Sequence, residues 1–313
     1  MGSRLRRRSY RSANRKIVGA SPEARPHISR EALLTLPHQT FAKDRVIIMS
    51  APNGARRTAD DHPALPISPR ELADCAQSLV EEGVSVLHLH VRDKHQKHTI
   101  DADCYRAAMK AVRERVGNAL VLQVTSEAVG IYARDEQMAM VRTLKPEAVS
   151  LGLRELCPDD KAEVEAAAFF AWLRKENIWP QYILYSADDV TRFDHMRRRG
   201  VFTDEHPFCL LVMGRYTDAL EGSLPELAAM LEAANCCEFP WAACCFGQHE
   251  NDAMLEATRA GGHVRIGFEN NLCLPDGSIA RDNAQLINKY RSSAMSYNRI
   301  PATADDIRSE CMS

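Results

Sequence analysis

The chain has 313 residues, 45% of them hydrophobic, and a formal net charge of -2 at pH 7. A chain of this size and composition can bury a large hydrophobic core, so we expect a globular protein. It has no apolar run close to the ~20 residues that span a membrane, and no apolar stretch typical of a secretory signal near its start. We therefore expect a soluble, cytoplasmic protein.

Positive charge is concentrated near the N-terminus. Residues 1–22 contain seven Lys or Arg residues and no acid, which leaves 33 basic and 42 acidic residues elsewhere. The mildly acidic body argues against nucleic acid as the main partner. We expect residues 1–42 to form a basic, disordered extension and connector, although an organelle transit peptide or a nucleic-acid-binding arm would also fit.

The ten cysteines lie in apolar contexts such as "NCCEF" and "AACCF". These contexts are typical of buried, reduced thiols in a cytosol-like compartment. No CxxC pair or zinc-finger spacing is present, so we expect no metal site built from cysteines.

Short apolar runs alternate with longer helical patterns from residue 45 onward. Eight runs are typical of strands, at residues 45–51, 84–91, 119–125, 147–152, 181–186, 208–214, 239–246 and 263–269. Helical patterns cover residues 68–83, 101–117, 160–176, 189–200, 224–235, 250–260 and 280–293. The first helical pattern has Ser68 as its N-cap, Pro69 at its first position and Glu71 to complete a capping box.

This alternation predicts a parallel α/β fold. Eight β-α units in roughly 250 residues fit a (β/α)8 TIM barrel better than a doubly wound sheet. We therefore predict a single catalytic barrel domain over residues 43–313. No G-x-G-x-x-G follows the first strand and the chain has no P-loop, so nucleotide sites of those types have no support.

Two histidines stand at alternate positions of the strand-like segment "SVLHLHVRD". His88 and His90 therefore point to the same side, at the strand end where barrel enzymes build their active sites. A lone strand histidine is usually a core residue, but two converging imidazoles favour a zinc site with a third ligand. Glu269 ends the last strand, and alternate strands of a barrel share a layer. Arg265 shares its inward face and could orient Glu269 or bind an anion.

Further polar residues end several of the predicted strands, and they indicate a small polar substrate in the mouth of the barrel. They are Thr125, Ser150, Tyr185, Ser186 and Arg215. Six histidines elsewhere in the chain are expected in loops or at the surface. They are His62, His95, His98, His195, His206 and His249.

Four segments together resemble a known family. They are "SAPNGARRTADDHPALPISPRELA", "SVLHLHVRD", "LQVTSEAVG" and "GGHVRIGFENN". In this order and spacing they resemble the β-keto acid cleavage enzymes (BKACE), whose founding type is the 3-keto-5-aminohexanoate cleavage enzyme. The resemblance implies a zinc-dependent (β/α)8 barrel, usually a homotetramer, which converts acetyl-CoA and a β-keto acid into acetoacetate and a new acyl-CoA.

The resemblance also implies roles for individual residues. The matching positions are His88, His90 and Glu269 as zinc ligands, Arg265 as the catalytic arginine, and Thr125 and Ser150 as substrate-binding residues. Asn53 is a further candidate for substrate binding. One position departs from the family pattern. Many relatives read "GFEDN" where this chain reads "GFENN", so Asn270 replaces an aspartate expected to assist proton abstraction. An amide cannot be that base, which leaves Arg265 with a water, or another carboxylate such as Glu127.

Two acidic positions of the amino-substrate type appear here as Arg56 and Ile183. The change removes negative charge from the pocket, so we expect a substrate side chain that is neutral or anionic. Arg56 could pair with a distal carboxylate in bidentate geometry. Arg215, beside the sixth strand, is our candidate for a phosphate of CoA.

Other classes of protein also place metals in barrels. Hydrolases of the amidohydrolase type use H-x-H, but on the first strand and with histidines on the fifth and sixth, where this chain has none. A metal-dependent aldolase or lyase that does not use CoA would also fit a metal site of this kind, and so would a non-catalytic metal-binding sensor. Cleavage that requires acetyl-CoA would separate the main hypothesis from all of these.

Overall fold

The computed structural model describes residues 42–204, 206–217, 219–234 and 239–312. The predicted extension over residues 1–42 therefore lies outside the described residues, apart from its last residue. No helix within these ranges is long and apolar enough to cross a membrane. The eight cysteines that they contain are all free thiols.

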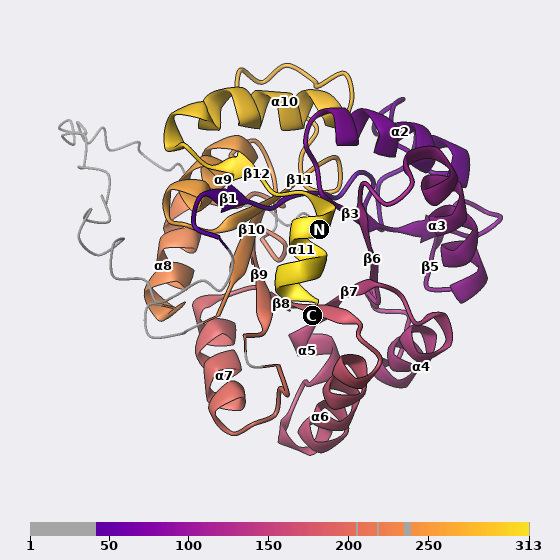
Figure 1. The fold of residues 1–313 in the computed structure, drawn as a ribbon, viewed down its shortest axis with the longest axis vertical. Helices are drawn as coiled ribbons and strands as arrows, with labels where there is room; N and C mark the ends of the chain where they lie inside the picture. The colour runs from indigo at the N-terminus through magenta and orange to yellow at the C-terminus, as the bar shows by residue number, and fades with distance from the viewer. Residues whose placement is uncertain (1–41, 205, 218, 235–238, 313) are drawn as a thin grey trace, which may run out of the picture.

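Eight parallel strands close into a barrel surrounded by helices (Figure 1). In chain order they are β2 (Ile48–Ser50), β3 (Val86–Leu89), β6 (Val121–Thr125), β7 (Ala148–Gly152), β8 (Trp179–Leu184), β9 (Phe208–Met213), β10 (Trp241–Cys245) and β11 (His263–Ile266). Each strand pairs with its neighbours in chain order, and β11 pairs with β2 to close the ring. The predicted (β/α)8 barrel is confirmed.

Four short strands within the described ranges lie outside the barrel. β1 (Arg45–Val46) pairs with β12 (Ile300–Pro301), and β4 (Val91–Arg92) forms an antiparallel hairpin with β5 (His98–Thr99). The predicted strand at residues 45–51 is thus divided into β1 and β2. The division falls at Ile47, whose backbone N–H donates to His263 Nδ1 at 3.0 Å instead of to a strand.

The helices are α2 (Pro69–Glu81), α3 (Ala102–Val116), α4 (Arg134–Leu144), α5 (Leu153–Leu156), α6 (Asp160–Lys175), α7 (Ala187–Arg198), α8 (Leu224–Ala234), α9 (Glu250–Arg259), α10 (Asn283–Ala294), the 3-10 helix η1 (Met295–Tyr297) and α11 (Ala304–Cys311). All seven predicted helices are present, and α2 begins with the predicted capping box. The prediction missed α4, because Ala133 precedes it and offers no side-chain cap. It also missed the short α5 and α11.

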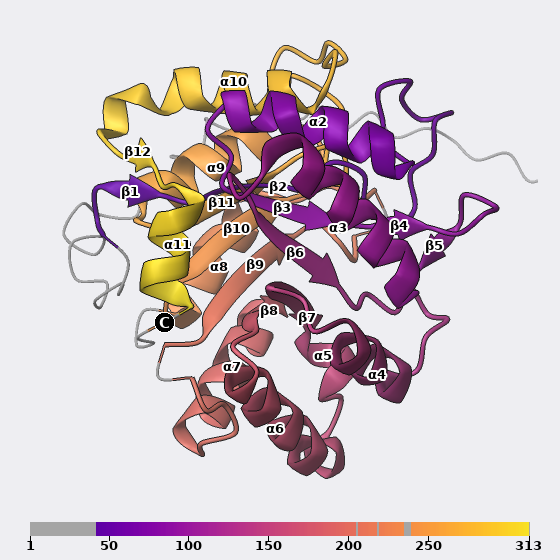
Figure 2. The same cartoon turned by 45° about the vertical axis from the view of Figure 1, so that its right-hand side comes forward.

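The core has two parts, one between the barrel and its helices and one inside the barrel. Ala304 and Ile307 of α11 belong to the inner part, so this helix closes one end of the barrel. Figure 2 shows α11, β1 and β12 at that end and the β4–β5 hairpin at the opposite end. The strands run toward the hairpin, and their carboxyl ends form the open mouth in which a substrate can bind.

Candidate active site

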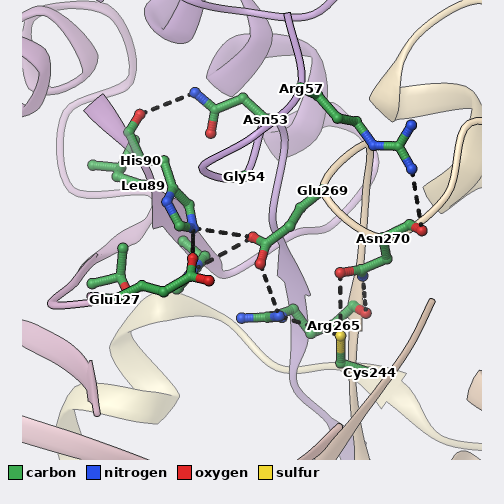
Figure 3. Close-up of polar contacts among 12 residues, drawn as sticks. Asn53, Gly54, Arg57, Leu89, His90, Glu127, Cys244, Arg265, Glu269 and Asn270 are labelled. Atoms are coloured by element: carbon green, nitrogen blue, oxygen red, sulfur yellow. Dashed lines mark hydrogen bonds and ion pairs between the residues drawn. The ribbon is translucent and has the colours of Figure 1, made fainter. Parts of the chain in front are cut away.

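His88 and His90, at the end of β3, are buried side chains whose Nε2 atoms lie 3.1 Å apart. Glu269 follows β11, and its Oε2 atom lies 3.6 Å from His88 Nε2 and 3.3 Å from His90 Nε2. The structure therefore brings the three predicted ligands together, with one ligand atom of each within 4.8 Å of the others. Figure 3 shows the Glu269 carboxylate directed at His90.

The hydrogen bonds of His88 prepare its ring to bind a cation. Its Nδ1 atom lies 2.8 Å from Gln123 Oε1, and Gln123 directs its amide nitrogen to Gln181 Oε1. Nδ1 therefore carries the proton, and the lone pair of Nε2 faces His90 and Glu269. Burial, reinforced by the charge of Arg265, lowers the pKa of His88 to about 3, so the ring is neutral. Neutral imidazole is the form that binds metals.

These residues fit a zinc ion. Three acceptor atoms meet in a buried space: His88 Nε2, His90 Nε2 and Glu269 Oε2. At most one of them, His90 Nε2, carries a proton, and a bound cation would satisfy all three. Two imidazole nitrogens and one carboxylate oxygen are a ligand set typical of catalytic zinc, which keeps a further position open for water or substrate.

Arg265 supports the carboxylate ligand from β11. Its Nη2 atom lies 3.3 Å from Glu269 Oε1 and donates to Cys244 Sγ at 3.2 Å. Burial by itself would raise the pKa of Glu269, but the charge of Arg265 and the hydrogen bond from His90 hold it well below its ordinary value. The carboxylate is therefore ionised and ready to bind a metal.

The segment after β2 packs against Glu269. The Glu269 N–H donates to Ala51 O at 3.0 Å, and Gly54 has φ +63°. A Cβ atom on Gly54 would lie 2.6 Å from Glu269 Cγ. Asn53 directs its amide nitrogen to His90 O at 3.0 Å and to Pro66 O at 2.9 Å, so it ties this segment to the end of β3.

Glycine at position 54 is therefore expected to be needed for tight metal binding. We predict that Gly54→Ala weakens zinc affinity by about 10- to 100-fold, as changes beside metal ligands commonly do, because the methyl group displaces Glu269. Competition with a zinc chelator measures the affinity. Gly277→Ala is the matched control, since Gly277 also has a positive φ but no atom within 4 Å of its would-be Cβ. Equal losses in the two variants would contradict the prediction.

Thr125 and Ser150 are paired across β6 and β7 and are both buried. Thr125 Oγ1 accepts a hydrogen bond from the Glu127 N–H at 3.1 Å, whereas Ser150 Oγ has no partner among the described residues. Thr125 lines a small cavity together with His88, Glu269, Arg265 and Ile183. A substrate in the mouth would therefore meet the metal ligands and Thr125 together.

Glu127 and Arg215 form an ion pair at the mouth, with Arg215 Nη2 2.8 Å from Glu127 Oε1. The other carboxylate oxygen of Glu127 lies 4.0 Å from His90 Nε2. The structure therefore holds Arg215, our candidate for a CoA phosphate, close to the three ligands, with its charge balanced by Glu127.

A model of the beta-keto acid cleavage enzymes matches residues 45–311. The chain belongs to the β-keto acid cleavage enzyme family. The resemblance carried by the four sequence segments is thus confirmed, and the protein is an enzyme.

Relatives in this family cover most of the chain. The 3-keto-5-aminohexanoate cleavage enzymes of Fusobacterium nucleatum and Acetoanaerobium sticklandii are 26% and 28% identical to it, and each match covers 85% of this chain and 97% of the relative. A 3-oxoadipate:acetyl-CoA acetyltransferase of Cupriavidus necator is 23% identical over 84% of this chain and 93% of the relative. Among solved structures, ObcA with oxaloacetate has a TM-score of 0.63 at 17% identity, covering 80% of this chain and 67% of ObcA, which shows a shared fold.

The residue that departs from the family pattern, Asn270, is buried behind Arg265. Its Nδ2 atom donates to Arg265 O at 3.2 Å and to Glu250 Oε1 at 3.0 Å, and its Oδ1 accepts from Cys244 Sγ at 3.2 Å. Sequence reasoning missed Glu250. The only signal for it was its position at the start of a predicted helix that follows a strand end.

The arginines of the "GARR" segment differ in their surroundings. Arg56, the predicted substrate contact, has an exposed side chain, whereas Arg57 is half-buried. Both line a cavity of about 240 Å³ beside Glu269. Arg57 donates to Asn270 O at 3.5 Å and forms no ion pair with a described residue. Sequence reasoning missed Arg57, because consecutive loop residues give no signal for burial.

Two of the histidines expected in loops or at the surface are buried. His62 lies in a loop, and its ring contacts Ala280 O at 2.8 Å. His98 belongs to β5, and its ring centroid is 5.5 Å from that of His90. The expectation holds for His62, which lies in a loop although it is buried. It was wrong for His98, because the pairing of β5 with β4 places this residue in a strand beside His90.

Proposed function

We propose that this enzyme is a zinc-dependent β-keto acid cleavage enzyme that converts a β-keto acid and acetyl-CoA into acetoacetate and a new acyl-CoA. The observation that carries the proposal is the convergence of His88, His90 and Glu269 beside Arg265 in a chain of this family. The name of the Cupriavidus necator relative supports acetyl-CoA as the second substrate.

The chain supplies groups for each part of the reaction. Zinc, when bound, would polarise the keto oxygen and lower the pKa of the CH2 group between the two carbonyls. The proton of this carbon would pass to Glu127 or to a water beside Arg265, the two candidates for the base. Arg265 offsets the negative charge that then develops, and burial strengthens that interaction. The Thr125 and Ser150 hydroxyls are available to hold the substrate carboxylate.

The bond changes then balance without an added oxidant or reductant. The carbanion attacks the thioester carbonyl of acetyl-CoA and releases CoA thiolate. The thiolate attacks the original keto carbon, and the bond between this carbon and the former CH2 breaks. The acetoacetate carbanion that this cleavage leaves takes back the proton first removed from the CH2 group, and the remainder of the β-keto acid leaves as an acyl-CoA.

The cavity beside Glu269 supports a substrate side chain that is neutral or anionic. Two of its three acids, Glu127 and Glu269, are already paired with Arg215 and Arg265, and the third, Asp61, accepts hydrogen bonds from Thr58 in its own loop. Arg57 has no such partner among the described residues, so it is a cation available to a distal carboxylate. Arg56, at the exposed rim, is the second candidate.

Two further features belong to the same proposal. A cytoplasmic location fits the composition of the chain, and the family resemblance predicts a homotetramer. Light scattering coupled to size-exclusion chromatography measures the number of chains per particle.

The test is to incubate zinc-analysed protein with acetyl-CoA and β-keto acids that carry cationic, neutral or carboxylate side chains. We expect acetoacetate and a matching acyl-CoA by mass spectrometry, with the cationic substrates poorest. Arg57→Gln should lower kcat/KM for dicarboxylic substrates by about 10- to 100-fold, the loss expected for a charged hydrogen-bonded pair, and spare neutral ones. Cleavage without acetyl-CoA would favour a lyase, and no product from any substrate would refute the proposal.

A further inference from the structure

A buried carboxylate behind the site has no cation in contact with it among the described residues. Glu250, the first residue of α9, is 2% exposed. Its Oε1 atom accepts hydrogen bonds from Gly267 N at 3.1 Å and Asn270 Nδ2 at 3.0 Å, and its Oε2 accepts from Asn271 Nδ2 at 3.3 Å. Burying an ionised group without a counter-ion is costly, so its position calls for a role beyond packing.

The contacts of Glu250 determine how the Asn270 amide is oriented. Asn270 Nδ2 faces two acceptors, Glu250 Oε1 and Arg265 O, so the Oδ1 atom must face the other way. There it accepts from Cys244 Sγ, which in turn accepts from Arg265 Nη2. Figure 3 shows Asn270, Cys244 and Arg265 in sequence along this path. A continuous chain of polar contacts thus leads from Glu250 to the arginine beside the metal ligands.

We propose that Glu250 and Asn270 act as one carboxylate–amide unit that positions Arg265, with Glu250 supplying the negative charge that the Asn270 amide lacks. The role in turnover rests on the proposed function. Glu250 is a positioning residue, because it acts through Asn270 and Cys244 and does not reach the substrate. Glu127 is the weaker candidate for this role, since its carboxylate is paired with Arg215 on the other side of the mouth.

The charge of Glu250 depends on its surroundings. Burial raises its pKa to about 8, against the hydrogen bonds from Asn270, Gly267 and Asn271 and the charge of Arg265, which lower it. The other ionisable groups near it are Arg57 and the thiols Cys244 and Cys245, and burial raises the pKa of both thiols so that they stay neutral near pH 8. All three groups in contact with the carboxylate are donors, so a protonated Glu250 would find no acceptor there. The unit is therefore complete only when Glu250 is ionised, above its raised pKa.

Exchanging the two side chains tests the unit. Glu250→Gln removes the charge, and Asn270→Asp places two carboxylates within hydrogen-bond distance, so that one of them must be protonated. We expect each single variant to lower kcat by about 10- to 100-fold with little change in KM, as small displacements of a catalytic group do. The double variant restores one carboxylate and one amide and should recover most of kcat. Wild-type kcat in Glu250→Gln, or a double variant no better than the poorer single, would overturn the proposal.

The pH profile separates positioning from structural support. In the wild type, kcat/KM should rise with pH through a limb near pH 8, the raised pKa of Glu250. The limb should be lost in Glu250→Gln and kept in Glu256→Gln, a matched change on the same helix at a residue that pairs with Arg259. A limb that persists in Glu250→Gln would contradict the proposal.

A stability cycle distinguishes failure of this proposal from failure of the proposed function. If the wild type forms no CoA-dependent product, the proposed function fails. The Glu250–Asn270 unit is then tested by thermal unfolding of the wild type, the two single variants and the double variant. The double variant should then be more stable than Asn270→Asp, because it no longer buries two adjacent carboxylates. If the effects of the two substitutions on stability are additive in the double variant, and all four proteins contain equal zinc, Glu250 and Asn270 do not act as a unit.

Discussion

Replacing His90 by alanine is expected to abolish zinc binding and to lower kcat/KM by about 1,000-fold or more. Only His88 and Glu269 of the three ligands would remain, and catalytic zinc needs three. Metal-ion Lewis acidity is worth several kcal/mol of transition-state stabilisation, and each ~1.4 kcal/mol is tenfold in rate. Zinc per chain, measured by mass spectrometry, should fall from one to near zero.

The matched control is His95→Ala, which removes an exposed histidine five residues along the same segment. It should keep both zinc and activity. If His90→Ala keeps one zinc per chain and near-normal activity, the three-ligand site is wrong. If it keeps zinc but loses activity, His90 acts in the reaction without being required as a ligand.

Replacing Arg265 by glutamine is expected to lower kcat by about 100- to 1,000-fold, the range found when one donor to a developing negative charge is removed. Arg265 is 3% exposed, so no solvent compensates for the lost charge. Its loss also removes the largest influence that lowers the pKa of Glu269, which leaves only the two histidines to stabilise the ionised carboxylate. Steady-state kinetics with zinc-loaded protein measures the effect.

Two variants sharpen this test. Arg265→Lys keeps the charge but replaces the planar guanidinium, whose Nη2 atom contacts both Glu269 and Cys244, with a compact ammonium, so its activity should lie between that of the wild type and the glutamine variant. Arg106→Gln, at an exposed ion pair on α3, should leave kcat unchanged. Equal losses at positions 265 and 106, or full activity in Arg265→Gln, would contradict the role of Arg265.

The pattern of the sequence was sufficient for the barrel. Strands and helices are periodic over short windows, so apolar runs and caps such as Ser68 report them directly. The two-residue period of a strand also placed His88 and His90 on one side. The layer rule of a barrel then brought Glu269 and Arg265 to the same end, although they lie more than 170 residues along the chain.

The contacts made by the loops could not be predicted from the sequence. No periodicity distinguishes the exposed Arg56 from the half-buried Arg57, and none predicts that β4 and β5 fold His98 against His90. The ion pair of Arg215 with Glu127 joins loops 88 residues apart. These contacts depend on the paths that the loops take once the barrel has formed.

Asn270 shows most clearly which features the sequence determines and which depend on the tertiary structure. By itself, the sequence determined that an amide follows Glu269 where an acid was expected, and it left the source of negative charge open. Only the tertiary structure decided that Glu250, 20 residues earlier, lies against that amide. The physical reason is that strand and helix periods act locally, whereas the packing of α9 against the loop after β11 depends on the closed barrel.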